Sequence, residues 1–564
     1  MTYRLPRPSH LALAAVTMAL SSGAALADSN WTSAGQNLSN SRFQASEERI
    51  SRNSVAGLTA KWSYNAAGDV TANPAVEGNY LYFPDAAGFL YKLDRRTGAL
   101  VWKFPVSGYT GIAGDYARAT PAISGDLLIM GNQNGKNLEM FSPYITPPQG
   151  AWMFAVNKNT GQGVWKTQVD AAKRSMVTQS AVVAKGMVYV GVASNEELVA
   201  GIVTKAPNPY APPFGGFVWE GRGSVLALDA KTGAIKWKTY TVPEGYYGGA
   251  VWSSTGAVDF KRNSIYMTTG DNTWVPPSVQ ACVGTALASG NDPSACHAAD
   301  DYFDAVIALD LDTGKIKWGK RGLPFDTWNV GCGLFVPGFM LPPNDNCPNP
   351  KGIDWDFAQG AILMGGDEDG DGALVGAGQK SGVFWAFRAK DGKLVWKTQV
   401  APGGLTGGLQ WGSAYDGKRI YVASSNAGPI LGNGTDAQPW TLKDGSVTTS
   451  GGWAALDPKT GKVLWTTKDP YGGRAEAAVS VANGVMFACN QEYNPSNPAM
   501  GAGHYVALDG ASGALLWSTP TVGGCNAGPS ISRGMVYWGS GMFRNTTRPA
   551  PVFGFGLPGG ESDD

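Results

Sequence analysis

The chain has 564 residues, with 44 lysines and arginines against 44 aspartates and glutamates. This balance excludes the basic surface that nucleic acid or an anionic membrane requires. Glycine, at 77 residues, is about twice its usual share of roughly 7%, which is typical of a chain with many tight turns. The length exceeds the about 100–200 residues of an ordinary domain, so it requires several domains or one large repeat architecture.

The first 27 residues have the pattern of a secretory signal peptide. Arg4 and Arg7 give a positive start, residues 11–20 are apolar, and Ala25-Leu26-Ala27 forms an A-x-A cleavage site before Asp28. The apolar run is shorter than the roughly 20 residues of a membrane-spanning helix, and no later stretch approaches that length. We therefore expect a soluble exported protein without a membrane span, periplasmic if the source is Gram-negative.

A hairpin pattern of twelve residues then recurs along the chain. In the copy from Leu226 to Trp237, a strand runs into the turn Asp229–Gly233 and the next strand ends in tryptophan. Asp bonds the backbone of such a turn and Gly accepts its positive φ. Seven copies end at Trp102, Trp165, Trp237, Trp318, Trp396, Trp465 and Trp517, and an eighth, at Trp62, keeps only the returning strand.

These tryptophans lie 40 to 81 residues apart, which allows four short strands per repeat with insertions in the longer ones. The pattern predicts an all-β fold, an eight-bladed β-propeller with tryptophan-docking repeats, as a single domain over residues 28–564. The half-copy at Trp62 predicts that an N-terminal strand completes the last blade and leaves no open edge. Residues 28–58 are polar and are expected to wrap the outside. The eight tryptophans are explained by packing between blades, so we assign them no catalytic role.

Six cysteines in an exported chain predict disulfide bonds. Six cysteines allow fifteen connectivities. The local pairs Cys282–Cys296 and Cys332–Cys347 would each close an insertion loop, and Cys489–Cys525 would join adjacent repeats. A metal or haem site built on cysteine is disfavoured because the sequence has no CxxC motif, and only His297 and His504 follow the predicted cleavage site.

Polar residues at the ends of predicted strands are candidates for a site on the propeller axis: Arg118, Glu196, Trp252, Asp271, Asn272, residues 326–329 and Lys380. Glu196 and Asp271 each follow an apolar strand, and each is either a solvated turn residue or a ligand for a hard cation. Oxygen ligands that converge from separate blades suit Ca²⁺. Residues 367–372 resemble the start of a calcium loop, but Gly378 stands where that loop needs glutamate, so an acidic turn is the simpler alternative.

Several segments resemble the pyrroloquinoline quinone (PQQ)-dependent alcohol dehydrogenases, and among them the polyvinyl alcohol dehydrogenases. The resemblance extends from Trp31 to Met542, and its most specific segments are VTQSAVVAKGMVYVGVASNEE, YYGGAVWSSTGAVD, VGAGQKSGVFWAF and GGLQWGSAYDGKRIYVASSN. The hairpin repeat alone is shared with non-catalytic propellers. The resemblance implies an eight-bladed ring with PQQ on its axis, no cytochrome c domain, and an alcohol as substrate.

The resemblance also implies the site residues. Trp252 would stack on PQQ and Lys380 would bond the quinone oxygens, while Arg118, Thr178 and Trp411 match further cofactor contacts. Glu196 matches the glutamate that binds Ca²⁺. Asp271 stands where the family has asparagine, and its added charge could tighten Ca²⁺ binding or favour a more highly charged cation such as a lanthanide.

The mechanism implied is hydride transfer from the alcohol to PQQ, with a metal as Lewis acid and a carboxylate that takes the hydroxyl proton. The family's base is an aspartate directly after a tryptophan, in a motif like PHDxWD. In this sequence residues 324–329 read PFDTWN, so Asn329 stands at the position of the base, and we expect Asp326 to act instead; the alternative is that Asp326 caps the loop. Residues 113–122 lack the adjacent cysteines of many small-alcohol enzymes, which indicates an open pocket for a bulky, secondary or polymeric alcohol.

A second hypothesis from another class is a non-catalytic periplasmic scaffold that resembles the outer-membrane assembly lipoproteins. Those proteins share the repeat and bind no quinone. The absence of a lipobox cysteine at Ala27-Asp28, and the presence of Glu196, Trp252, Asp271 and Lys380 together, favour the enzyme. Without a haem motif, the electrons have to leave to an external acceptor, for which cytochrome c is the candidate.

Overall fold

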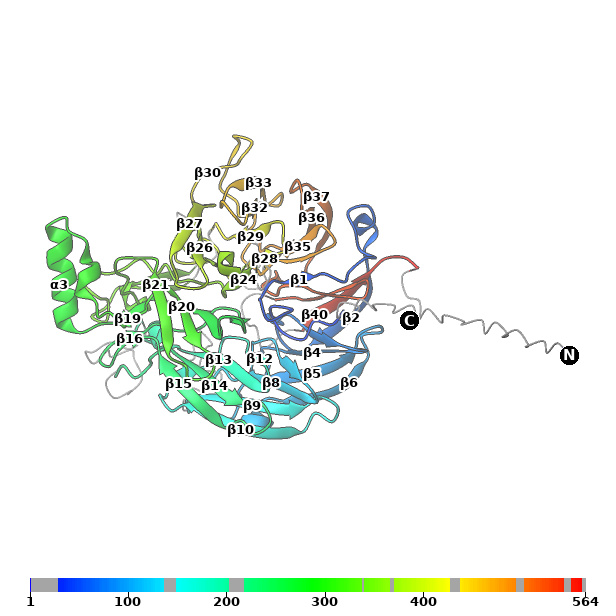
Figure 1. Ribbon diagram of the computed structural model, residues 1–564, viewed down its shortest axis with the longest axis horizontal. Coiled ribbons are helices and arrows are strands. Elements are labelled where there is room, and N and C mark those ends of the chain that lie inside the picture. Colours follow the sequence, from blue (N-terminus) through cyan, green and yellow to red (C-terminus); the bar gives the residue numbers. More distant parts are fainter. Residues whose placement is uncertain are drawn as a thin grey trace.

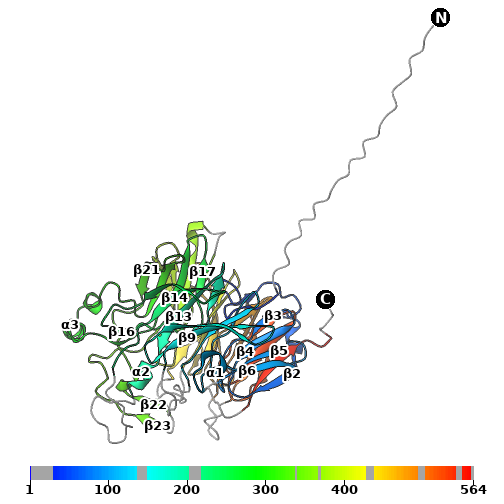
Figure 2. The same cartoon turned by 90° about the horizontal axis from the view of Figure 1, so that it is seen from below.

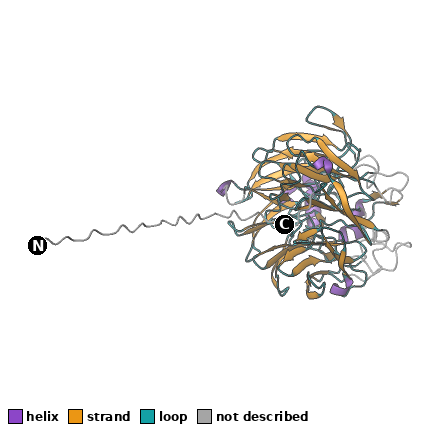
Figure 3. Ribbon diagram, turned by 90° about the vertical axis from the view of Figure 1, so that its right-hand side faces the viewer, coloured by secondary structure: helices purple, strands orange, loops and turns teal. Residues whose placement is uncertain are grey.

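The computed structural model describes residue 1 and residues 29–135, 149–201, 218–336, 339–365, 370–426, 437–492, 502–541 and 549–559. Most of the predicted signal peptide and much of the acidic turn at residues 367–372 lie outside the described residues. Strands dominate the described chain (Figure 3) and form sheets arranged around a central axis (Figure 1).

Eight blades of four antiparallel strands make up the ring, and the sheets of blades three and seven each gain one further short strand. The chain order within each blade runs from the innermost strand outward, except that the outermost strand of the eighth blade comes from the N-terminal segment. Blade one consists of β3 (Ala75–Glu77), β4 (Tyr80–Pro84), β5 (Phe89–Asp94) and β6 (Leu100–Pro105), and blade two of β7 (Ala122–Ser124), β8 (Leu127–Gly131), β9 (Ala151–Asn157) and β10 (Gly163–Asp170). Blade three consists of β12 (Val182–Ala184), β13 (Met187–Ser194), β14 (Ser224–Asp229) and β15 (Ile235–Tyr240), and blade four of β17 (Ala257–Asp259), β18 (Ser264–Thr268), β20 (Ala305–Asp310) and β21 (Ile316–Arg321). Blade five consists of β24 (Ile362–Met364), β25 (Leu374–Gly378), β26 (Val383–Arg388) and β27 (Leu394–Gln399), and blade six of β28 (Ala414–Tyr415), β29 (Ile420–Ser424), β32 (Gly452–Leu456) and β33 (Val463–Lys468). Blade seven consists of β34 (Ser480–Ala482), β35 (Val485–Cys489), β36 (His504–Asp509) and β37 (Leu515–Pro520), and blade eight of β38 (Ser530–Ser532), β39 (Met535–Gly539), β40 (Ala550–Gly556) and β2 (Thr59–Ala66).

Smaller elements decorate the ring. They are strand β1 (Phe43–Gln44), strand β11 (Ser175–Met176), the pairs β16 (Tyr247–Gly248) with β19 (Asn272–Trp274), β22 (Leu334–Val336) with β23 (Phe339–Leu341) and β30 (Trp440–Thr441) with β31 (Val447–Thr448), helices α1 (Ser107–Thr110), α2 (Glu196–Val199) and α3 (Pro277–Ala288), and 3₁₀ turns η1 (Val55–Gly57), η3 (Pro293–Cys296), η4 (Val330–Cys332) and η5 (Gly370–Gly372). Helix α3 projects from the ring (Figure 1), while α2, β22 and β23 lie near one another on the side that faces down in Figure 2.

The ring closes as the half-copy at Trp62 predicted. Strand β2 pairs with β40 through residues 59–66 and 550–556, so the N-terminal strand is the outermost strand of the eighth blade. The innermost strands contact one another in the order β3, β7, β12, β17, β24, β28, β34, β38 and back to β3. The predicted eight-bladed propeller is therefore confirmed.

Each blade docks its tryptophan on the next one. The indole N–H of all eight repeat tryptophans donates to a backbone carbonyl of the following blade at 2.9–3.2 Å. In the turn that receives Trp165, the Asp229 carboxylate caps the Thr232 amide at 2.9 Å, and Gly233 has φ +72°. The aspartate and glycine of the repeat therefore form the turn against which the neighbouring indole packs.

Substitution of Gly233 tests this packing of indole against turn directly. An added Cβ would lie 2.5 Å from the Trp165 ring, so Gly233→Ala is expected to lower the free energy of unfolding by about 1–3 kcal/mol through overpacking. Gly186 is the matched control, because its φ of +76° is similar and nothing lies within 4 Å of its added Cβ. Urea unfolding of both variants measures the difference, and equal losses would contradict the docking role.

The segment after the predicted cleavage site does not wrap the outside. Backbone groups of Trp31, Thr32, Leu38, Ser39, Ser41 and Arg42 bond the innermost strands of blades one, two, four, five, six and seven, at Val76, Ile123, Val258, Leu363, Tyr415 and Val481. Strand β1 then adds to the free side of β34. The expectation for residues 31–44 is wrong because the innermost strands are open edges, and this polar segment satisfies their unpaired backbone groups.

The three predicted disulfides are present: Cys282–Cys296, Cys332–Cys347 and Cys489–Cys525. The first two close insertions, and the third joins the end of β35 to the segment before β38. Within the described residues, no helix combines the length and apolar character needed to cross a membrane.

Candidate functional site

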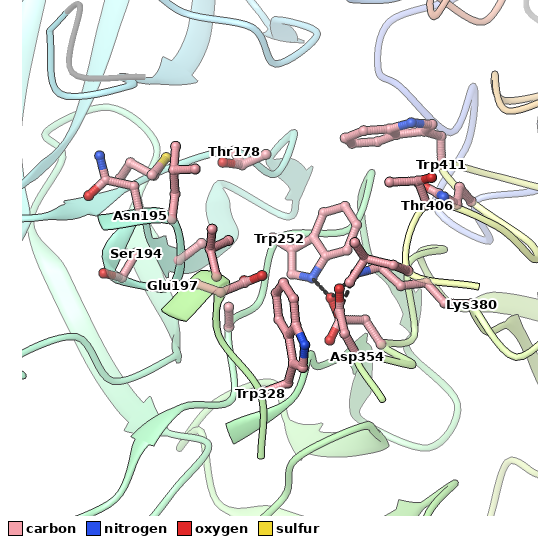
Figure 4. A pocket seen from close by; sticks show the side chains of 18 of the residues that line it. Thr178, Ser194, Asn195, Glu197, Trp252, Trp328, Asp354, Lys380, Thr406 and Trp411 are labelled. Carbon is pink, nitrogen blue, oxygen red and sulfur yellow. Dashed lines mark hydrogen bonds and ion pairs between the residues drawn. The ribbon is translucent and has the colours of Figure 1, made fainter. Parts of the chain in front are cut away.

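A cavity of about 380 Å³ lies where the loops before the innermost strands meet the ends of the second strands (Figure 4). Five blades supply its polar and aromatic lining, which includes Arg118, Thr178, Glu197, Trp252, Asp354, Asp356, Lys380 and Trp411. The innermost strands are only two or three residues long, so the loops that precede them carry side chains directly to the axis. The size is in the usual range for a small-molecule site, about 300–1,000 Å³.

Lys380 forms the centre of a buried charge cluster. Its Nζ lies 2.5 Å from Asp354 Oδ1 and 2.9 Å from Asp356 Oδ2. Burial lowers the Lys380 pKa, but the two carboxylates outweigh burial and hold the pKa well above its usual value. Burial raises the pKa of Asp354 well above its usual value in spite of Lys380.

Asp356 connects this cluster to the other predicted site residues. Its Oδ2 accepts a hydrogen bond from Trp252 Nε1 at 3.1 Å, and its Oδ1 accepts one from the Asp271 amide at 2.7 Å. The Lys380 amide donates to the Asp356 carbonyl at 2.9 Å. The structure therefore brings Trp252, Asp271 and Lys380 together, as the sequence analysis expected, around an aspartate that it did not name.

A second cavity of about 20 Å³ adjoins the first and is lined by three carboxylates, Glu197, Asp271 and Asp356. Its volume is that of roughly one water or one ion. The Oδ2 atom of Asp271 is buried and has no hydrogen-bond partner among the described residues. Burial, together with Asp356 and Glu197, raises the pKa of Asp271 well above its usual value, and burial raises the pKa of Glu197 to about 7. A cation would relieve this accumulation of negative charge.

The described residues do not close a metal site by themselves. No group of three or more histidine, cysteine, aspartate or glutamate side chains in the described parts of the chain is arranged to hold an ion. The larger cavity opens onto the same Glu197 and Asp356, so a molecule bound there is placed to add further ligands.

Glu196, the predicted metal ligand, faces away from the cavity. Its Oε1 accepts from the Glu220 amide and its Oε2 from the Gly221 amide, both at 2.9 Å. Burial raises its pKa to about 7 against these two bonds. Glu197, the next residue of α2, is the one that lines the cavity. Glu196 instead binds residues 220 and 221 to α2.

Asp326, the predicted base, is fully buried and lies outside the residues that line either cavity. Its carboxylate accepts three backbone amides, from Ile353 at 2.8 Å, Asp354 at 3.2 Å and Trp355 at 2.8 Å. Burial raises the Asp326 pKa, and these bonds lower it. The geometry matches the alternative weighed for this residue, a cap of the loop.

Asn329 is equally structural. Its Nδ2 donates to the carbonyls of Thr273 and Asn346 at 3.0 Å, and its Oδ1 accepts the Gly331 amide at 2.8 Å. Sequence reasoning missed the aspartate that does follow a tryptophan at the site, Asp356 after Trp355. The signal was available in the letters DWDF at 354–357, a few residues before β24.

Two tryptophans shape the cavity. The centroids of Trp252 and Trp411 lie 5.4 Å apart with their planes at 83°, so Trp411 presents a wall perpendicular to Trp252 (Figure 4). The Arg118 guanidinium lies 4.5 Å from the Trp411 ring centroid. Thr178 lies on the opposite wall (Figure 4). All the residues predicted to contact the cofactor thus line one cavity.

The segment that leads into the Cys332–Cys347 insertion makes part of the wall apolar. Trp328 and Val330 from this segment pack with Leu198 of α2 and Leu405, and all four line the cavity. Asn344 and Asn346 each donate to the Ala200 carbonyl at 2.9 Å, which fixes the insertion against α2.

Comparisons with known proteins agree with this fold. A family model described as outer membrane protein assembly factor BamB matches residues 59–239, 379–493 and 450–542. The polyvinylalcohol dehydrogenase of Sphingopyxis sp. (strain 113P3) is 28% identical over 91% of this chain and 73% of its own length, and that of Pseudomonas sp. is 26% identical over 92% and 74%. The structure of a quinohemoprotein alcohol dehydrogenase from Pseudomonas putida HK5 aligns with TM-score 0.64 at 18% identity over 95% of this chain and 81% of that one.

The fold and the docking tryptophans define the class, a closed propeller of tryptophan-docking blades. Because its model matches more than half of the residues, the chain belongs to the propeller family described by the BamB model. That repeat is common to scaffolds and enzymes, but the full-length relatives are dehydrogenases. The resemblance to PQQ-dependent alcohol dehydrogenases, and to polyvinyl alcohol dehydrogenases among them, is confirmed, and the chain is a quinoprotein of the alcohol dehydrogenase class.

Proposed function

We propose that this chain oxidises a bulky or secondary alcohol to a ketone or aldehyde in a PQQ- and cation-dependent reaction. The observation that carries the proposal is the buried Asp356, which contacts Trp252, Lys380 and the Asp271 backbone at the edge of a ligand-sized cavity. A scaffold has no use for a buried charged cluster that opens into a cavity, because burying charge costs free energy.

The residues fit PQQ, a planar quinone with three carboxylates. Trp252 offers an apolar face, and Arg118 and Lys380 offer positive charge in the same cavity. Glu197 and Asp271 would hold the cation, since both line the small cavity and the Asp271 Oδ2 has no hydrogen-bond partner in the part of the chain that the structure describes. We assign to Glu197 the role that the sequence analysis gave to Glu196. Both Ca²⁺ and a lanthanide accept such oxygen ligands, and the charge of Asp271 favours the latter.

Asp356 is the proposed base. It lines both cavities, so its carboxylate reaches an alcohol bound there and takes the hydroxyl proton. Lys380, paired with Asp354 and Asp356, keeps the Asp356 carboxylate in place and balances its charge. When bound, PQQ supplies the quinone that accepts hydride and the cation supplies a Lewis acid.

Location and partners follow from the same proposal. The chain is proposed to be a periplasmic propeller of residues 28–564, released from a signal peptide of residues 1–27. It would pass electrons to a separate acceptor such as cytochrome c, because the sequence contains no CxxCH haem motif.

The apolar wall favours alcohols with a hydrocarbon chain over methanol. Leu405→Ala is expected to lower kcat/KM for a long secondary diol by about 10-fold and to leave the value for methanol unchanged, because lost apolar contact costs about 1–3 kcal/mol. The control is Leu394→Ala in β27, the strand that precedes the loop of Leu405, because its side chain is exposed. A wild-type enzyme that prefers methanol, or equal losses on both alcohols, would refute this substrate class.

Reconstitution tests the function itself. The PQQ-free, metal-free protein is mixed with PQQ, with Ca²⁺ or La³⁺, or with both, and dye reduction is followed on primary, secondary and polymeric alcohols. Activity that needs PQQ and a cation, and that Glu197→Gln abolishes, would support the proposal. A folded protein that binds neither PQQ nor metal would instead favour the non-catalytic scaffold.

A further inference from the structure

Trp411 is held in an unusual conformation. Its φ is +57°, in the left-handed region that residues with a bulky side chain rarely adopt. Its amide donates to the Ala358 carbonyl at 3.2 Å, and the Gly412 amide donates back to Gln410 at 2.7 Å, so the backbone makes a sharp reversal. Such conformations persist only where the surroundings fix them.

A buried carboxylate from the next blade holds the Trp411 indole. Trp411 Nε1 donates to Glu476 Oε1 at 3.0 Å. Glu476 is 8% exposed and lies four residues before β34. A hydrogen bond to a charged acceptor is stronger than one to a neutral acceptor, so Glu476 is a firm anchor for the indole.

Glu476 is itself held by side chains from two segments. Asn526 Nδ2 donates to the same Oε1 at 3.2 Å, and Arg474 forms an ion pair with Oε2. Arg474 also donates to the Thr406 carbonyl at 3.2 Å and to Ser425 Oγ at 3.3 Å. Thr406 lines the cavity, so this network fixes Glu476 relative to the cavity wall.

The other side of Trp411 faces the site. Its ring stands at 83° to Trp252 and beneath the Arg118 guanidinium. A planar molecule stacked on Trp252 therefore meets Trp411 as an end wall. Rotation of the indole would change the length of that slot and displace Arg118.

We propose that Glu476 is a positioning residue, which sets the orientation of Trp411 and thereby the end wall of the slot for a planar anionic aromatic cofactor. This inference rests on the proposed function, since PQQ is the cofactor concerned. Glu476 acts through Trp411 and does not line the cavity.

The first measurement needs no cofactor. With fluorinated tryptophan in the PQQ-free protein, Glu476→Ala is expected to shift or broaden the ¹⁹F resonance assigned to Trp411, while Glu492→Gln leaves it unchanged. Glu492 is a suitable control because it also makes a partly buried pair, with His504 at 2.6 Å, outside the cavity lining. An unchanged Trp411 resonance in Glu476→Ala would overturn the positioning role whether or not PQQ binds.

The second measurement is the PQQ affinity of the same variants by equilibrium dialysis. Glu476→Ala and Trp411→Phe are each expected to weaken binding about 10-fold, and the double variant to be no weaker than the worse single one, because both remove the same contact. Glu476→Gln, which keeps an oxygen acceptor, is expected to recover most of the affinity. Additive losses would overturn the inference. If the Trp411 resonance shifts but the protein does not bind PQQ, the proposed function is overturned, while the role of Glu476 in orienting Trp411 is retained.

Discussion

Asp356→Asn is expected to lower kcat by about 10²–10⁴-fold in the protein loaded with PQQ and cation, because an amide cannot take the alcohol proton. Asp356 is the carboxylate that joins both cavities and contacts Trp252 and Lys380. Single-turnover reduction of bound PQQ by alcohol measures the loss, and PQQ content measured in parallel separates chemistry from cofactor binding.

Asp326→Asn is the matched comparison. Three amides donate to the Asp326 carboxylate, and an asparagine NH₂ group opposes at least one of them. We therefore expect a lower midpoint of unfolding but substantial kcat in the protein that remains folded. A folded Asp326→Asn variant without turnover, beside an active Asp356→Asn variant, would restore Asp326 as the base.

The two aspartates show where the interpretation of the sequence and the structure differ. The motif-like segment at residues 324–329 carries Asp326, whereas Asp356, which lines both cavities, stands in the letters DWDF at 354–357. The insertion between them contains the Cys332–Cys347 disulfide. The Asp326 carboxylate accepts hydrogen bonds from the amides of residues 353–355, so it joins two segments that lie 27 to 29 residues apart in the sequence. Linear spacing cannot reveal a contact made over such a gap.

The sequence was also insufficient to predict which glutamate of α2 faces the cavity. Both Glu196 and Glu197 follow β13, and the sequence alone does not say which side chain a single helical turn directs to the axis. The amides of Glu220 and Gly221 decide it, because they take both oxygens of Glu196. Those amides lie in a distant segment whose position is set by tertiary structure.

The fold was more predictable because its signal repeats. Each hairpin with its tryptophan is one local unit, and Trp62 marked the closure that β2 and β40 make. The placement of residues 31–44 was not predictable in the same way. That segment has no periodicity of its own and follows the open edges of strands from six other blades.

Lys380→Met is expected to cost the PQQ-free protein about 3–5 kcal/mol of unfolding free energy near neutral pH, because it leaves Asp354 and Asp356 buried without their cation. Lys390→Met is the control. Its pair with Asp371 is exposed, and such pairs contribute about 0–1 kcal/mol. Urea unfolding of both variants measures the difference, and equal, small losses would contradict a stabilising role for Lys380.

The loss of unfolding free energy in Lys380→Met is also expected to depend on pH, and its direction can be stated. Burial already holds the pKa of Asp354 well above its unfolded value, and removal of Lys380 raises it further. A carboxyl group with a raised folded pKa binds its proton more tightly in the folded state, so its contribution to stability is present at low pH and is lost as pH rises through that pKa. The gap between Lys380→Met and wild type should therefore be smaller at about pH 5 than at about pH 8. A gap that widens toward low pH would mean that Lys380 stabilises the fold by some route other than pairing with these carboxylates.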